Sequence, residues 1–265
     1  TADNNTAVGH CALFANTTGQ CNVAIGVSAL CTNTEGNRSI AIGCGALRLQ
    51  TGGGSNDNVG IGFHAGCTVN GGEKNVAVGN YALCANTTAN DNTAVGYSSM
   101  CDVTTGVCNT SIGRLSGRIT STGDNNASFG YDSQPSAFGA DNQITLGNSN
   151  NNNLRCADTS ISTLSDLRDK TNVKDIPHGL DYILALRPVK FDWNTRDGTR
   201  KGKKDYGFIA QELDKVETDF GSAEYTRLVH KDNPEKWEAD VMKTYPILIK
   251  AIQELKAEIE LLKKK

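Results

Sequence analysis

The first 150 residues follow a pattern of apolar and small positions that repeats along the chain. A glycine recurs with a 17-residue period, with one step of 19, at Gly9, Gly26, Gly43, Gly62, Gly79, Gly96, Gly113, Gly130 and Gly147. The residue before each glycine is apolar in all nine repeats, the residue two positions earlier is mostly β-branched, and the residue between them is small. Alternation of this kind over about five residues predicts short β-strands with one packed face.

Other positions of the repeat predict how the strands are connected. The glycine predicts a tight turn with positive φ, which glycine adopts without steric cost. An Ala-Leu pair, such as Ala29-Leu30, follows the glycine and predicts a second short strand that packs inward. The 19-residue step includes Gly52–Gly54, and we expect a bulge there.

One such unit is too short to bury its own apolar face, whereas nine stacked units, here called rungs, would bury it between them. The sequence therefore predicts a β-solenoid, on the order of 40 Å long at roughly 4.8 Å per rung. One column of asparagines is expected to form a ladder in which each side-chain amide bonds to those above and below. Its members are Asn5, Asn22, Asn58, Asn75, Asn92, Asn109 and Asn126.

The motif Asn-x-small-aliphatic-Gly, as in Asn22–Gly26 and Asn75–Gly79, resembles a known family of repeats. It is similar to the head repeats of trimeric autotransporter adhesins and to repeats in phage tail fibres. The resemblance covers residues 1–150 and implies a left-handed parallel β-roll, three copies of which pack side by side. The period alone supports only a stacked solenoid, so handedness and the homotrimer rest on the resemblance.

Charge density changes abruptly near Asp158. Residues 1–158 contain six basic and ten acidic residues, whereas residues 159–265 contain 20 and 19. We therefore expect two domains, a mainly β shaft at 1–158 and an α+β domain at 159–265. The second domain is expected to contain a helix that ends before Pro188, a strand over 189–193, and a further helix entered from Gly207.

The end of the chain, residues 243–265, predicts a long amphipathic helix. Its apolar residues recur in steps of three and four: Tyr245, Leu248, Ile252, Leu255, Ile259 and Leu262. This spacing is typical of a coiled-coil seam. The repeat is less than three heptads long, so packing of the helix against its own domain is the alternative.

Three segments of the second domain carry a second resemblance: 165–174, 179–193 and 206–213. They closely resemble the intramolecular chaperone domain of peptidase family S74, found at the ends of phage endosialidases, of phage tail fibres and of the myelin regulatory factor of animals. The resemblance implies that Ser165 is a nucleophile and Lys170 its general base. It also implies that the domain cuts itself from the shaft beside Ser165. We expect the cut between Leu164 and Ser165, with a cut after Ser165 left open.

This chemistry sets physical requirements. A hydroxyl needs a neighbouring base to take its proton, and an ammonium group cannot be that base until it loses its own proton. Backbone N–H groups or other donors must also receive the developing oxyanion. Residues five apart lie on different faces of a helix and of a strand. Ser165 and Lys170 can therefore meet only if the chain bends between them or if they meet across subunits.

Other polar residues receive structural interpretations. We interpret the charged residues after Ser165 as a local salt-bridged surface: Asp166, Arg168 and Asp169. Gln211 and Glu212 are interpreted first as the start of a helix and secondarily as residues that support the site. His178 and His230 have no partner that the sequence fixes.

The nine cysteines contain no Cys-x-x-Cys pair. Four share one position of the repeat, five residues after the glycine: Cys31, Cys67, Cys84 and Cys101. A shared column is what stacking predicts for small filler residues. We therefore expect reduced thiols, no metal site and no cofactor.

Net charge and hydropathy exclude two classes of partner. The net charge of −3 gives no electrostatic basis for binding nucleic acid. No apolar run approaches the roughly 20 residues that span a bilayer, so we expect no membrane insertion. Thr1 begins inside a repeat, so a piece of a longer protein is expected.

These expectations favour a viral tail fibre or spike, and the chain would be its C-terminal part. It would assemble in the host cytoplasm, become part of the virion, and shed its chaperone domain after the cut. The shaft would attach to a host receptor, either a glycan or a protein. The alternative is a bacterial trimeric surface adhesin that binds a host ligand. A glycan depolymerase would need paired carboxylates, and the repeats contain few acidic residues.

Overall fold

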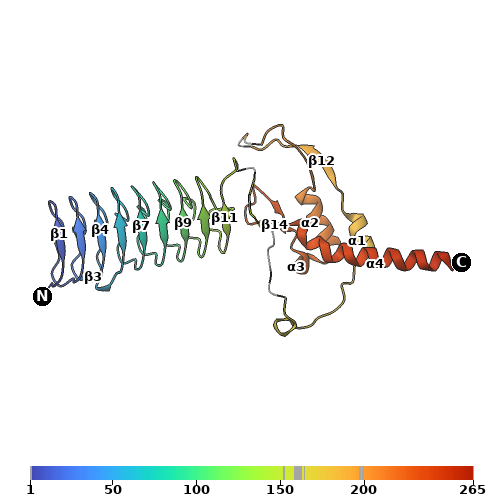
Figure 1. Cartoon of the computed structure of the whole chain (residues 1–265), viewed down its shortest axis with the longest axis horizontal. Coiled ribbons are helices and arrows are strands. Elements are labelled where there is room, and N and C mark those ends of the chain that lie inside the picture. The colour runs from blue at the N-terminus through green and yellow to red at the C-terminus, as the bar shows by residue number, and fades with distance from the viewer. Residues whose placement is uncertain are drawn as a thin grey trace. The chain divides into compact units, whose positions relative to one another are not determined.

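The structure is a computed structural model that describes residues 2–151, 153–157, 163, 165–196, 198 and 200–264. The chain forms two compact units, Thr1–Asn151 and Asn152–Lys265. Figure 1 shows a stack of short strands in the first unit and a mixture of helices and strands in the second. The expected domain boundary near Asp158 lies outside the described residues.

The first unit is a β-solenoid built around one parallel sheet of nine strands. The strands are β1 (Thr6–Val8), β2 (Val23–Ile25), β4 (Ile40–Ile42), β6 (Val59–Ile61), β7 (Val76–Val78), β8 (Thr93–Val95), β9 (Thr110–Ile112), β10 (Ala127–Phe129) and β11 (Ile144–Leu146). Val8 pairs with Ile25 and Ile25 pairs with Ile42, so the apolar residue before each glycine forms one column. The predicted stacking of 17-residue rungs is confirmed.

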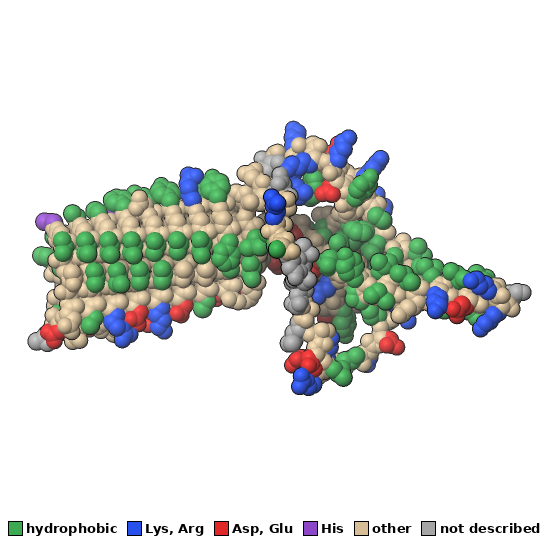
Figure 2. All heavy atoms as spheres, viewed as in Figure 1, with side chains coloured by type: hydrophobic (Ala, Val, Ile, Leu, Met, Phe, Trp, Pro, Cys, Tyr) green, Lys and Arg blue, Asp and Glu red, His purple; other side chains and the backbone are tan. Residues whose placement is uncertain are grey.

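The face of the strands that packs inward differs from the expectation. The small middle residues Ala24 and Ala41 are fully buried, whereas Ile25 and Ile42 remain 38% and 36% exposed. The expectation that stacking buries the large column is therefore wrong for the single chain. The physical reason is space: a Cβ added at Gly60 would lie 2.8 Å from Leu47. The large residues instead form two exposed rows along the unit, visible in Figure 2.

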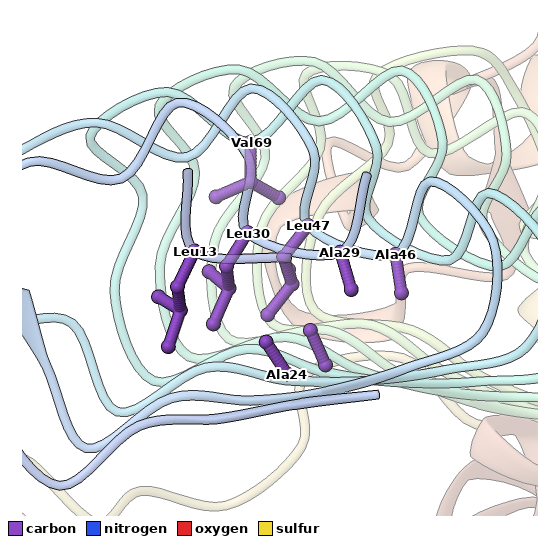
Figure 3. Packing of buried hydrophobic residues seen from close by; sticks show 8 residues of the cluster. Leu13, Ala24, Ala29, Leu30, Ala46, Leu47 and Val69 are labelled. Carbon is purple, nitrogen blue, oxygen red and sulfur yellow. The ribbon is translucent and has the colours of Figure 1, made fainter. Parts of the chain in front are cut away.

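The Ala-Leu pairs fill the interior of the solenoid from the side opposite the nine-stranded sheet. Leu13, Leu30 and Leu47 point into the coil in a row, as Figure 3 shows, and all three are buried. Inward packing is thus confirmed, but the predicted second strand is wrong. These leucines lie in turns with φ between 47° and 50°, in the left-handed region, which a strand cannot contain.

The repeating glycine is required by the close approach of the rungs. Gly26 has φ of 135°, and a Cβ built on it would lie 2.5 Å from the carbonyl oxygen of Gly43. The same clash would recur at Gly79 with Gly96. The predicted positive φ is confirmed, and stacking is the stronger reason for glycine at this position.

The asparagine column forms a ladder that differs in its bonds from the expectation. Most side-chain oxygens accept the backbone N–H of the next asparagine, as in Asn109 N to Asn92 Oδ1 at 2.9 Å. The Nδ2 group donates to a carbonyl 14 residues later, as in Asn92 to Gly106 O at 2.8 Å. The expected bond between side-chain amides is present in two rungs, Asn75 to Asn58 and Asn126 to Asn109, each at 3.2 Å. These bonds satisfy buried asparagines and link each rung to the next.

The 19-residue step is accommodated where the bulge was expected. Gln50 still lies 17 residues after its partner Asn33, whereas Asp57 lies 19 residues after its partner Arg38. The two extra residues therefore enter between Gln50 and Asp57. Here β3 (Gly36–Asn37) pairs with β5 (Gly54–Ser55) in a small separate parallel sheet.

The second unit combines short helices with small antiparallel sheets. Its elements are η1 (Leu167–Asp169), α1 (Leu180–Ala185), β12 (Val189–Asp192), β13 (Lys204–Gly207), α2 (Ala210–Asp219), α3 (Ala223–Thr226), β14 (Val229–His230), β15 (Glu238–Ala239), η2 (Val241–Lys243) and α4 (Thr244–Lys263). β12 pairs with β13, and β14 pairs with β15. The expected helix before Pro188, the strand after it and the final helix are all present.

Four buried residues form the core of this unit: Tyr182, Leu213, Leu228 and Ile247. Glu254 of α4 accepts the backbone N–H of Leu180 at 2.7 Å and so caps the start of α1. A Cβ at the preceding Gly179 would lie 2.3 Å from that carboxylate, so a larger residue there would displace the Glu254 cap. The C-terminal helix is thus anchored on α1 by one of its faces.

Candidate functional site

Ser165 and Lys170 lie within hydrogen-bonding distance of each other. The Lys170 ammonium donates to Ser165 Oγ at 2.7 Å. The chain bends between them through η1, a single turn of 3-10 helix. Of the two ways in which residues five apart could meet, the single chain therefore provides the bend within one subunit. Leu164, the expected residue before the cut, lies outside the described residues.

The bend is stabilised by a cap at its start. Asp166 accepts the backbone N–H of Arg168 at 2.9 Å and also pairs with the Arg168 side chain at 2.7 Å. This hydrogen-bonded pair lowers the pKa of the Asp166 carboxyl, so the cap stays ionised at neutral pH. The predicted local salt bridge is present, and it holds the turn that brings Ser165 to Lys170.

The pair lies on the surface of the single chain. Both Ser165 and Lys170 are exposed. An exposed ammonium is well solvated, and water stabilises its charged form. The described residues thus bring the two groups into contact. They do not shield Lys170 from water, as a lysine that acts as a base requires.

Arg187 was not identified from the sequence, but it is the partner of Glu212. Both lie beside a small cleft lined by Leu186, Phe208 and Leu213 among others. The Arg187 side chain bonds to Glu212, at 3.0 Å from Nε, and lowers the pKa of the Glu212 carboxyl. Glu212 lies in the first turn of α2, as predicted, and Gln211 beside it is exposed. Arg187 and Glu212 are too far apart along the chain for their pairing to leave a signal in the sequence.

The two histidines of this unit have structural surroundings. His178 lies 3.5 Å from Asp181 and packs edge-on against Phe220 with ring centres 5.0 Å apart. His230 lies in the short strand β14. Neither residue contacts the Ser165–Lys170 pair in the interactions recorded among the described residues.

The C-terminal helix has two apolar faces. Ile247 and Ala251 are buried on one face. The predicted seam residues on the other face are 41% to 68% exposed: Tyr245, Leu248, Ile252, Leu255, Ile259 and Leu262. The alternative, packing on its own unit, is confirmed for the Ile247 face, whereas the coiled coil stays a prediction whose seam is uncovered in the single chain.

All nine cysteines are free thiols in the structure. Burial raises the pKa of the Cys67 thiol, whereas a hydrogen bond with Cys101 lowers the pKa of Cys84 to about 7. Within the described residues, no three or more His, Cys, Asp or Glu side chains are grouped so that they could hold a metal ion. No helix in the described part of the chain is both long and apolar enough to cross a membrane.

Comparison with known proteins gives one match. Residues 165–222 match the family model Peptidase S74, described as the chaperone of endosialidase. The match begins at Ser165 and ends just after α2, so the second unit contains an S74 domain. No curated protein and no solved structure matches the chain.

Proposed function

We propose that the chain is part of a viral tail fibre or spike, in which an S74 domain directs trimerisation of a β-solenoid shaft and then releases itself. The combination of an S74 domain with a solenoid of 17-residue rungs supports a fibre-like shaft with its chaperone. The observation that carries the self-cleavage is the 2.7 Å contact of Lys170 Nζ with Ser165 Oγ at the first residues of the matched domain.

The proposed reaction is a single turnover in each chain. Ser165 Oγ attacks the carbonyl carbon of Leu164 and gives its proton to Lys170. The amide nitrogen of Ser165 then leaves and takes up a proton, which converts the amide bond into an ester. Water hydrolyses the ester and yields the carboxylate of Leu164 and a new amino terminus at Ser165. The sequence contains both reacting groups, so no metal or cofactor is needed.

Assembly would control the timing of the cut. A lysine acts as a base only when it is neutral, and removal from water favours the neutral form. Because Lys170 is exposed in the single chain, a neighbouring subunit would provide that cover in the trimer. Cleavage would then occur only after the three shafts have come together.

Two exposed apolar surfaces support association with further copies of this chain, and the number three rests on the resemblance of the repeats. The exposed strand column of the shaft includes Ile25, Ile61 and Ile112, each more than a third exposed. The α4 seam is a second uncovered apolar row. Contiguous apolar rows of this length are unusual on monomers and mark association surfaces. We propose that both rows are buried in the homotrimer and that the assembled shaft attaches to the host cell as part of the virion.

The test is a comparison of freshly expressed wild-type protein with Ser165→Ala. The wild type should yield a product beginning at Ser165 and ending at Lys265, identified by mass spectrometry, together with a shaft whose mass in light scattering is that of a trimer. The Ser165→Ala chain should stay intact because it has no hydroxyl. Processing of Ser165→Ala at this junction, or a monomeric wild-type shaft, would contradict the proposal.

A further inference from the structure

A stripe of aromatic residues runs along the shaft apart from the strand columns. It consists of Phe63, Tyr81, Tyr97, Arg114 and Tyr131, all of which are exposed. Each lies one or two residues after the repeating glycine, so the stripe lies on the turn that follows each strand. Figure 2 shows a line of hydrophobic side chains along an edge of the unit, above the two rows on the strands.

The stripe is a continuous set of ring contacts. Phe63 and Tyr81 have ring centres 5.3 Å apart at an angle of 81°, and Tyr81 and Tyr97 follow at 6.1 Å and 80°. The Arg114 guanidinium continues the series, 5.9 Å from the ring of Tyr97 and 5.4 Å from that of Tyr131. Consecutive rings meet edge to face rather than flat on one another, and Phe63, Tyr81 and Tyr97 each stay more than a third exposed to a ligand.

The backbone beneath the stripe is held by bonds between rungs. Tyr81 N donates to Phe63 O at 2.9 Å, and Leu115 N donates to Tyr97 O at the same distance. Asp132 N donates to Arg114 O, also at 2.9 Å. These bonds fix the spacing of the backbone that carries the rings before any ligand arrives, which lowers the ordering cost of binding.

Apart from the contacts of Arg114 with two rings, the polar groups of the stripe have no partner among the described residues. No hydrogen bond joins the hydroxyls of Tyr81, Tyr97 or Tyr131 to other described residues. Across the same described residues, Arg114 forms no salt bridge with an acidic side chain. The stripe thus offers flat apolar rings, free hydroxyl groups and one uncompensated positive charge.

We propose that this stripe binds an acidic polysaccharide, which specifies the partner class of the proposed host attachment and rests on that function. Aromatic rings pack against the C–H faces of pyranose sugars, and the rungs repeat at roughly 4.8 Å, similar to the length of one sugar unit. The tyrosine hydroxyls bond to sugar hydroxyls. Arg114 pairs with a carboxylate on the chain, because a guanidinium fork matches carboxylate geometry.

The experiment uses the cleaved wild-type trimer and measures retardation in gels containing a defined polysaccharide. Polygalacturonate, alginate and hyaluronate are the acidic probes, and dextran and amylose are the neutral ones. The wild type should bind at least one acidic chain more tightly than the neutral chains.

Tyr97→Ala and Arg114→Gln should each weaken binding of that acidic chain by at least about tenfold. The affinity of the Arg114→Gln variant for the acidic chain should also change little with salt concentration, because the charge that salt screens is gone. Phe138→Ala, which removes an aromatic ring that is 68% exposed and outside the stripe, is the matched control and should bind as the wild type does.

Trimer mass and cleavage are measured on the same preparations, so failure of this proposal is distinct from failure of the proposed function. Trimeric, cleaved protein that binds none of the acidic probes would overturn the stripe as a glycan site while leaving the fibre intact. Equal binding of acidic and neutral chains would overturn the role of Arg114. Dissociation of the trimer by Tyr97→Ala would show that the stripe is covered by a second copy and would also overturn the proposal.

Discussion

The two units of the chain bury their side chains in different ways. In the shaft, each rung pairs with the equivalent residues of the next, and the same contacts recur from β1 to β11. In the second unit, one core joins Tyr182, Leu213 and Ile247, and each makes contacts that occur once. The shaft is therefore uniform along its length, whereas the second unit has a single arrangement.

Uniformity carries a cost for folding. A rung that pairs one repeat out of register still buries alanine against alanine and bonds asparagine to asparagine, so a slip of one whole repeat costs little free energy. In the proposed trimer, three identical shafts would multiply the number of such slips. In the proposed trimer, the second unit, which does not repeat, would fix where the three chains start. The comparison explains why a repetitive shaft would be joined to a domain that is needed only once.

The largest effect is expected at Lys170, in the unit proposed to act once. Lys170→Ala should slow cleavage at least about a hundredfold, because a general base typically contributes that much to a rate. Lys170→Arg should not restore cleavage, because a guanidinium stays protonated. The measurement is the fraction of cut chain over time on denaturing gels. If Lys170→Arg cleaves at the wild-type rate, Lys170 is not the base.

The second prediction tests the close stacking of the shaft. Gly96→Ala should destabilise the shaft by roughly 3 kcal/mol or more, because φ is 133° and the new Cβ would lie 2.5 Å from the Gly113 carbonyl oxygen. The matched change in the second unit is Gly207→Ala, where the nearest atom lies at an ordinary 3.4 Å. That variant should fold normally. Denaturant midpoints of the two variants measure the difference, and equal midpoints would contradict the packing described for the shaft.

The third prediction concerns the shaft after the second unit has left. Cleaved protein should unfold at least about tenfold more slowly in detergent or heat than intact Ser165→Ala, because the domain proposed to lower the folding barrier would be gone. The control is Ser165→Ala with a protease recognition site inserted after Arg155. Cutting this protein after assembly should make it as resistant as the cleaved wild type. Equal unfolding rates for the cut and intact forms would disprove the kinetic role of release.

The repeat predicted much of the shaft, because every column could be compared nine times. The glycine column and the strands followed directly from that comparison. The direction in which Ile25 faces did not, because alternation shows that two faces exist but not which of them lies inside a narrow coil. The left-handed leucines, such as Leu30, were missed because a leucine with positive φ is rare and has no signature in the sequence.

The candidate site was less accessible to sequence reasoning. Ser165 and Lys170 were selected through resemblance, and their spacing alone left two geometries open. The turn that joins them depends on Asp166 as a cap, a role that an Asp two residues before Arg168 does not reveal by itself. Arg187 and Glu212 meet only because β12 and β13 intervene between them and return the chain.

The smallest effect is expected at the cysteine column, where neighbouring thiols of the same column differ in acidity. A hydrogen bond with Cys101 lowers the pKa of Cys84 to about 7, whereas burial raises the pKa of Cys67. Only the thiolate reacts with iodoacetamide, so the rate follows the ionised fraction. Between pH 8 and pH 6 the alkylation rate of Cys84 should fall about tenfold, against about a hundredfold for a thiol with an ordinary or raised pKa.

Peptide mass spectrometry reports the alkylation of each cysteine separately. Comparing how the two rates change with pH, rather than the rates themselves, removes differences in access between the two sites. In Cys101→Ala, the alkylation rate of Cys84 should depend on pH as strongly as that of Cys67, because the hydrogen bond that favours the Cys84 thiolate is lost. Identical slopes for Cys84 and Cys67 in the wild type would show that stacking does not couple these thiols.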